Sequence, residues 1–221
     1  MGDVKEFDLR EGQRAERKSL LTVVEWGEYT LLAAEPADWA TQYNTYYTRI
    51  DTGNGYVYKQ VSADTAPTFA TDTYYSRADI RQLLGTRTPD SSIEYNADIS
   101  TETDILGNNY TDVNKTQPQQ SFDPFVILGG SRLGAKMNDI RRRNAISELN
   151  QFTAYIITGF IGNTTDGYEA EKHTDCTITY DSFGGDTIVN FPITVYFSNK
   201  LTTGKVDKLS DDFTFTPDVN I

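Results

Sequence analysis

The sequence has almost none of the residues from which disulfides, metal sites and nucleophilic catalysts are built. Its 221 residues include one cysteine, Cys176, and one histidine, His173. A single cysteine excludes an intramolecular disulfide, and a single histidine excludes a multi-histidine metal site. The two residues are three positions apart on one expected strand and lack an orienting partner, so we expect both to be structural. No phosphate-binding glycine loop and no GxSxG motif occurs. We therefore expect no enzymatic activity, no cofactor and no metal.

Long apolar runs and a surplus of positive charge are also missing. The longest apolar runs fall far short of the roughly 20 residues that span a bilayer, and residues 1–19 alternate in charge where a secretory signal would be apolar. We expect a chain made in the cytoplasm without a membrane anchor. Twenty basic and 32 acidic residues give a net charge of −12. This sign opposes general binding to DNA phosphates, yet it suits a surface past which DNA slides without sticking.

Aromatic residues are abundant, with 14 Tyr, 11 Phe and 2 Trp, and this argues against disorder. Many lie in residues 29–77, where Gly53-Asn54-Gly55 between two aromatic runs predicts a hairpin. We interpret the segment as an inserted hairpin or mini-domain on the outer surface. Its aromatic residues pack the module itself, stack on sugars or contact another subunit. The candidate outer-surface aromatics are Trp39, Tyr43, Tyr46, Tyr47, Tyr74 and Tyr75.

One convincing helix is expected, at about residues 131–143. Ser131 follows two glycines and is placed to cap the first free amides. Leu133, Met137 and Ile140 recur at helical spacing, so they share one apolar face. Three arginines, 141–143, come at the C-terminal end, where we expect them to pair with carboxylates within or between subunits.

Most of the remaining pattern predicts antiparallel strands. Leu20–Trp26 reads as a first core strand, and Phe152–Ile161 is apolar on both faces and must be covered on two sides. Residues 176–180 alternate, as do residues 189–197, where Pro192 predicts an edge or a bulge available for docking. A short strand, residues 212–216, precedes Pro217. The fold class is therefore α+β: a mostly antiparallel β-sandwich or half-barrel with one flanking helix.

Residues 90–123 are strongly acidic. The spacing of Asp98, Glu102 and Asp104 lacks the glycine and closing glutamate of a calcium-binding EF-hand loop. A pair of carboxylates such as Glu94 and Glu102 could serve a glycosidase, whereas a solvated acidic sheet face is the commoner explanation. The candidate acidic face comprises Asp90, Glu94, Asp98, Glu102 and Asp104.

Two stretches together resemble the major tail tube protein of long-tailed, siphovirus-type bacteriophages. They are SFDPFVILGGSRLGAKMNDIRRRNA and DCTITYDSFGGDTIVNFPITVYFSNKLTTGKVDK, within a resemblance that covers Gly85–Val219 and part of the N-terminus. The resemblance rests on the order of features along the chain: acidic strand pair, FDP turn, helix, long strand, FGGD turn, FPI strand and basic tail. Residues 29–77 depart from the pattern. The resemblance implies a tail tube domain of residues 1–28 and 78–221, with arms at 1–18 and about 200–221.

The resemblance also implies a structural virion protein. Six copies would form a ring whose sheets close into a β-barrel, and stacked rings would form the hollow tube that conducts DNA into the host. Its partners would be itself, tail terminator and tail-tip or baseplate proteins, the tape measure protein, and DNA in an acidic lumen without sequence-specific binding. The candidate intersubunit contacts are Arg10, Arg14, Arg17, Arg141, Arg142, Arg143, Phe191 and Pro192. Two alternatives remain open: a carbohydrate-binding or adhesion module built on residues 29–77, and an acid-pair glycosidase.

Overall fold

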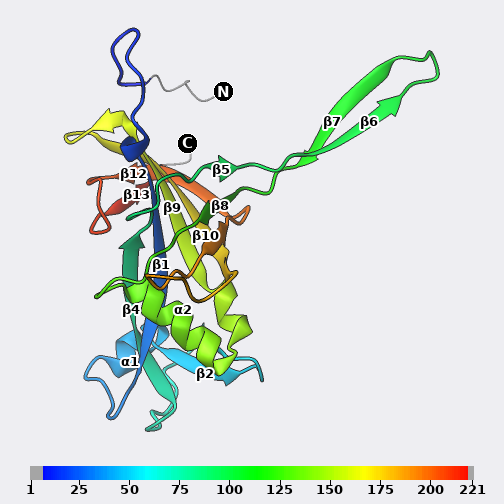
Figure 1. Ribbon diagram of the computed structural model, residues 1–221. Helices are drawn as coiled ribbons and strands as arrows, with labels where there is room; N and C mark the ends of the chain where they lie inside the picture. The colour runs from blue at the N-terminus through cyan, green and yellow to red at the C-terminus, as the bar shows by residue number, and fades with distance from the viewer. Residues whose placement is uncertain (1–6, 219–221) are drawn as a thin grey trace.

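The computed structural model describes residues 7–218, and its main element is a curved antiparallel sheet of eleven strands (Figure 1). The strands run in the order β3-β2-β4-β1-β9-β10-β11-β8-β5, and β12 and β13 extend the sheet from the first half of β10. Their bounds are β1 Leu20–Leu31, β2 Tyr47–Asp51, β3 Tyr56–Gln60, β4 Tyr74–Leu83, β5 Ile93–Glu94, β8 Gln119–Phe122, β9 Phe152–Asn163, β10 Gly167–Tyr180, β11 Ile193–Tyr196, β12 Leu201–Val206 and β13 Phe215–Pro217.

The sheet folds over on itself. β10 pairs with β12 along its first half and with β11 along its second half, so it belongs to both layers. Across the fold, the Thr22 hydroxyl of β1 lies 2.6 Å from the Gln120 side-chain oxygen of β8, although β1 and β8 are not neighbours in the sheet. The mostly antiparallel β-structure with few helices expected from the sequence is therefore present, and it is compatible with an α+β sandwich. Completion of a barrel by further copies stays a prediction.

The helix α2, Arg132–Arg143, lies where the sequence places it. The Ser131 hydroxyl accepts a hydrogen bond from the Gly134 amide, as the capping pattern predicts. Leu133, Met137 and Ile140 are fully buried against the sheet, and the helix ends at Asn144 in a left-handed conformation. The remaining helical turns are α1 Trp39–Gln42 and the 3₁₀ turns η1 Arg17–Ser19, η2 Tyr43–Thr45 and η3 Ile146–Asn150.

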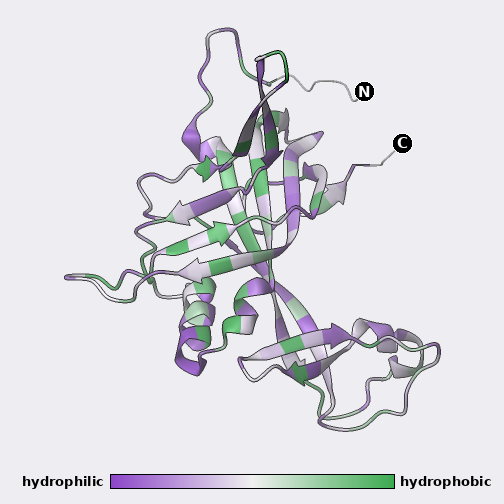
Figure 2. Ribbon diagram, turned by 90° about the vertical axis from the view of Figure 1, so that its right-hand side faces the viewer, coloured by the Kyte–Doolittle hydropathy of each residue, from purple (hydrophilic) through white to green (hydrophobic). Residues whose placement is uncertain are grey.

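Strand β9 is covered on both faces, as its apolar sequence predicts. Phe152 and Ile156 join the larger core, which lies between the sheet and α2. Tyr155 and Ile157 point the other way, into a smaller core closed by Phe213 from the loop before β13. Figure 2 shows hydrophobic residues along the strands of the body and on the helix beside them. Period-two alternation thus places two layers of side chains around one central strand.

Residues 29–77 extend the sheet and include the predicted hairpin. β4 pairs with β1 over nine residues, from Leu83 opposite Val23 to Tyr75 opposite Leu31. The predicted Gly53–Gly55 hairpin joins β2 to β3, and β2 pairs with the start of β4. A third small cluster around Trp39, Val61 and Tyr74 packs this end of the molecule.

Of the two alternatives that Pro192 predicts for residues 189–197, an edge or a bulge, the edge is wrong. β11 is not an edge strand, because it pairs with β10 on one side and β8 on the other. Pro192 directly precedes β11, so the missing amide interrupts no ladder bond, and its carbonyl accepts from the Asp181 amide. Phe191 and Pro192 are buried. They are therefore not available as intersubunit contacts.

The two terminal segments contact the chain's own sheet. Phe7 packs edge-on against Phe160, and the Asp8 amide donates to the Phe160 carbonyl. The C-terminal segment contributes β12 and β13 to the sheet. Residues 1–6 and 219–221 of the two expected arms lie outside the described residues.

Candidate functional site

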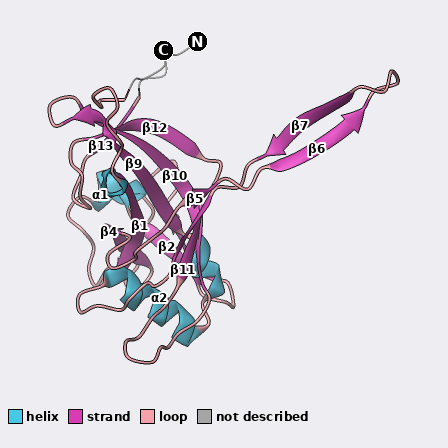
Figure 3. Cartoon of the chain, turned by 45° about the horizontal axis from the view of Figure 1, so that its top comes forward, coloured by secondary structure: helices cyan, strands magenta, loops and turns pink. Residues whose placement is uncertain are grey.

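A two-stranded hairpin stands clear of the rest of the molecule (Figures 1 and 3). It consists of β6, Asp98–Thr103, the turn 104–108, and β7, Asn109–Lys115. These strands pair only with each other in the described chain. We call residues 98–115 the arm. A lone two-stranded hairpin is marginally stable in water, so an exposed one of this length is a natural element for contact with another molecule.

The two faces of the arm differ chemically. Residues directly opposite in an antiparallel pair share a face, and the pairs Ile99–Val113 and Thr101–Thr111 make one face uncharged and β-branched. The other face carries the pairs Ser100–Asp112 and Glu102–Tyr110. There the Tyr110 hydroxyl donates to the Glu102 carboxylate at 2.7 Å. One face thus suits packing against a protein surface, and the other suits solvent.

The tip of the arm is held in place by hydrogen bonds among its own residues. The Asp104 carboxylate accepts from the amides of Leu106 and Asn108 at 2.8 and 2.9 Å. These bonds lower the pKa of Asp104, with the Asn108 side chain as the largest cause. The Ile105 and Leu106 side chains nevertheless face water, with relative exposures of 102% and 81%. The arm therefore presents an organised apolar knob, which is typical of a contact site.

The candidate acidic residues are spread along the arm and its base. Asp98 and Glu102 lie in β6, Asp104 shapes the tip, and Glu94 lies in β5, where it accepts a hydrogen bond from Gln119. Asp90 is exposed in the loop before β5. The five carboxylates are solvated, as expected, but most lie on the arm and not on one face of the main sheet. Whether they line a bore stays a prediction.

The candidate basic residues have different surroundings. Arg17 donates to the Ser91 carbonyl, and Arg141 lies 4.3 Å from the ring centre of Phe183. Arg143 forms ion pairs with Asp139 and Glu148, so the expected pairing with carboxylates is confirmed for this residue within the chain. Arg10, Arg14 and Arg142 are exposed.

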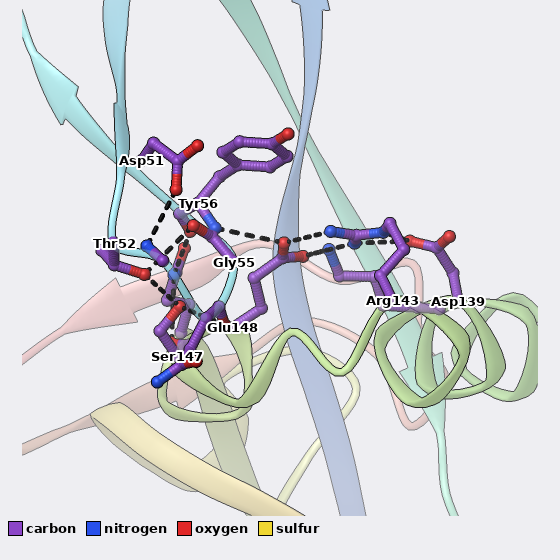
Figure 4. Close-up of polar contacts among 12 residues, drawn as sticks. Asp51, Thr52, Gly55, Tyr56, Asp139, Arg143, Ser147 and Glu148 are labelled. Atoms are coloured by element: carbon purple, nitrogen blue, oxygen red, sulfur yellow. Dashed lines mark hydrogen bonds and ion pairs between the residues drawn. The ribbon is translucent and has the colours of Figure 1, made fainter.

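A buried carboxylate, Glu148, joins three parts of the chain (Figure 4). It accepts from Lys136 and Arg143 of α2 and from the Tyr56 amide at the start of β3. Burial alone would raise the pKa of Glu148, but the hydrogen bonds from Arg143 and Lys136 outweigh it and leave the pKa below its ordinary value. Next to it, Ser147 bonds to Thr52 and to the Asn54 carbonyl. Ser147 thus fixes the β2–β3 hairpin to η3, and Glu148 links η3 to α2.

The aromatic residues of segment 29–77 are less exposed than expected. Trp39 is 3% exposed, with its indole N–H bonded to the Pro67 carbonyl, and it packs against Phe69 and Tyr74. Tyr74 and Tyr75 are buried as well. These three are not outer-surface aromatics, because Trp39 and Tyr74 pack together in one small cluster and Tyr75 packs edge-on against Tyr58 of β3. Tyr43, Tyr46 and Tyr47 are half-buried.

His173 and Cys176 are structural, as the sequence predicts. The His173 ring packs against Phe197, and its Nδ1 lies 2.8 Å from the Ser198 carbonyl oxygen. Cys176 is fully buried, and burial raises the pKa of its thiol. Within residues 7–218, no group of three or more His, Cys, Asp or Glu side chains is arranged to hold a metal ion.

No family model, no curated protein and no solved structure matches this chain. Across the described part of the chain, none of the helices has the length and apolar character that crossing a bilayer requires.

Proposed function

We propose that this protein is a structural virion protein that assembles into stacked hexameric rings, the hollow tail tube through which a bacteriophage ejects its DNA. The single observation that carries the proposal is the arm. Its exposed knob and uncharged face bury nothing within the chain, and a protein made to work alone would not be expected to keep such a surface. The sequence resemblance supplies the class of assembly.

The placement of the arm favours assembly from many copies of one chain. It leaves the body on one side, so a matching acceptor on the body creates a head-to-tail contact. Such contacts generate closed rings when the rotation between copies closes, and helical filaments when it does not. A ring-based tube needs a contact of this kind.

The charge of the chain is compatible with a DNA conduit. The net charge is −12, and the exposed face of the arm adds carboxylates without compensating cations beyond Lys115. At physiological salt, charges act over about 8 Å, so carboxylates near a bore would repel DNA phosphates that fill it. Carboxylates near the bore would let DNA pass without binding.

Negative-stain electron microscopy of the purified protein at high concentration tests the proposal. We expect rings or hollow rods, and we expect a variant with residues 98–115 replaced by a short Asn-Gly turn to remain monomeric. The Tyr95 carbonyl and the Gln117 amide already bond across the base of the arm, so the body should tolerate this replacement. Wild-type protein that stays monomeric under all conditions, including in intact virus particles, would contradict the proposal.

The carbohydrate-binding alternative has little support at its main residue. It depended most on Trp39, whose ring is buried and whose N–H is already bonded. A glycan array with the full-length chain would reopen it if specific binding were found and were lost on replacing the half-buried Tyr43 and Tyr47.

A further inference from the structure

A groove on the body has the properties that the knob of the arm requires. It has a volume of about 570 Å³ and lies between the end of β4, the loop before α2 and the loop before β13. Its lining includes Leu83, Phe125, Leu128, Gly129, Arg132 and Leu209. Leu209 is partly exposed at 39%. The groove therefore offers apolar surface that is still in contact with water.

The position of the groove excludes the chain's own arm as its occupant. The arm projects from one side of the molecule, whereas β13 and the loop before it lie on the opposite side (Figure 1). β6 has six residues, so at about 3.4 Å per residue the arm extends roughly 20 Å outward from the body. Only a second copy can bring a knob into this groove.

The charges of the two surfaces are complementary. The arm carries Asp98, Glu102, Asp104 and Asp112 against one cation, Lys115. The groove contains Arg81 and Arg132 against one carboxylate, Asp211. Arg81 is held by Glu25, whereas Arg132 has no ion-pair partner within residues 7–218. An uncommitted cation thus lies beside apolar surface, where an acidic arm with an apolar tip would dock.

Another large cavity is a poorer match. It has a volume of about 640 Å³ and lies between the β9–β10 turn and strands β12 and β13. Its lining includes three carboxylates, Asp166, Asp207 and Asp218, against one cation, Lys205. Like charges would oppose entry of the arm there.

We infer that the knob, Ile105 and Leu106, of one copy docks in the groove beside Gly129 and Arg132 of a second copy. This inference rests on the proposed function and names the contact that joins neighbouring copies. The uncharged face of the arm lies toward the apolar wall of the groove, and the carboxylates of the arm lie toward Arg132. Arm and groove lie on opposite sides, so each copy is donor to one neighbour and acceptor to another.

A mixed-copy disulfide experiment tests the contact. One preparation carries Leu106→Cys and a second carries Gly129→Cys. A side chain at Gly129 would meet nothing within 4 Å, so this variant should fold normally. After mixing, assembly and mild oxidation, we expect a disulfide-linked dimer on a non-reducing gel. Cys176 is buried with a raised thiol pKa and should contribute little background.

The control pairs Leu106→Cys with Thr165→Cys, an exposed position in the β9–β10 turn, and each single variant is oxidised alone. If rings or rods form but the Leu106–Gly129 cross-link does not exceed these controls, the docking of the knob in the groove is contradicted and the proposed tube assembly is not. A specific cross-link without rings or rods would support the groove and contradict the tube. No particles and no cross-link would contradict both.

A steric block provides a second readout. Gly129→Trp should fold as the wild type does, because the added side chain points into open space, but it should fill the mouth of the groove. We expect the protein concentration needed for assembly to rise about tenfold or more, as expected when one well-buried contact is lost. Unchanged assembly of a folded Gly129→Trp variant would contradict the inference.

Discussion

The arm and the β9–α2 region use similar residues and end in opposite environments. β9 and the arm both contain β-branched and aromatic residues in extended runs. β9 is covered on one face by the helix and on the other by Phe213, whereas the arm is covered on neither. The difference shows that sequence patterning sets which residues share a face but not whether that face is covered. Stability and assembly should therefore map to separate parts of this chain.

The largest expected effect on stability comes from Phe152→Ala. Phe152 is fully buried and packs edge-on against Trp26. We expect the free energy of unfolding to fall by about 3–5 kcal/mol, because the substitution removes buried area and leaves a cavity. Urea denaturation followed by tryptophan fluorescence measures it. If Phe152→Ala lowers the free energy of unfolding no more than Ile105→Ala on the arm does, the two regions do not differ in their contribution to stability.

The second largest effect on stability is expected from Glu148→Gln. We expect the free energy of unfolding to fall by about 1–3 kcal/mol at neutral pH, because the substitution weakens charge-assisted hydrogen bonds to Lys136 and Arg143. The matched control is Asp139→Asn, which removes the charge of the exposed partner of Arg143. It should lower the free energy of unfolding by less than Glu148→Gln does.

The contribution of Glu148 also depends on pH. Because the pKa of Glu148 is lowered in the folded protein, its stabilising effect is complete above the ordinary value of 4.5 and is lost as the pH falls through the folded pKa. The difference between wild type and Glu148→Gln should therefore shrink in urea titrations at pH 3. A constant difference from pH 7 to pH 3 would show that the effect is steric.

Ser131→Ala should lower the free energy of unfolding by about 1 kcal/mol, which is the usual effect of removing a helix cap. Ser131→Asp keeps an acceptor for the Gly134 amide and should restore most of the loss. Thermal unfolding by circular dichroism distinguishes the two variants. Equal stability of Ser131→Ala and wild type would show that the cap contributes nothing here.

The smallest expected effect on stability comes from the double change Ile105→Ser, Leu106→Ser. Both side chains are exposed, so the free energy of unfolding should change by less than about 0.5 kcal/mol. Assembly should fall sharply in the same samples, as judged by light scattering and electron microscopy. Lost stability, or assembly that survives, would remove the separation between body and arm.

Local patterns were sufficient for much of the body. The spacing of Leu133, Met137 and Ile140 predicted the buried face of α2, and Ser131 predicted its start, because both depend on residues close in sequence. The hairpin at Gly53–Gly55 follows from turn chemistry in the same way.

Predictions that depend on distant neighbours were less successful. Trp39 is buried by Phe69 and Tyr74, which no local pattern brings to it. Pro192 suggested an edge strand, but β8 covers that side through residues about 70 positions earlier in the chain.

The sequence predicts an acidic strand pair within residues 90–123, but it does not predict that this pair stands clear of the main sheet. Alternation alone does not tell whether a third strand pairs alongside. The Ile105-Leu106-Gly107 sequence within a polar stretch was the available signal.

The long strand β10 has a consequence for how the chain acquires its structure during synthesis. β10 pairs with residues 201–206 along its first half and with residues 193–196 along its second half, and β1 pairs with β9, which lies more than 120 positions later in the chain. Neither core can close until nearly the whole polypeptide has left the ribosome. The hairpin at 98–115 emerges earlier and needs nothing but its own two strands. If the arm docks in the groove as proposed, a nascent chain exposes the tip before its acceptor has folded, and assembly would have to follow the release of complete subunits.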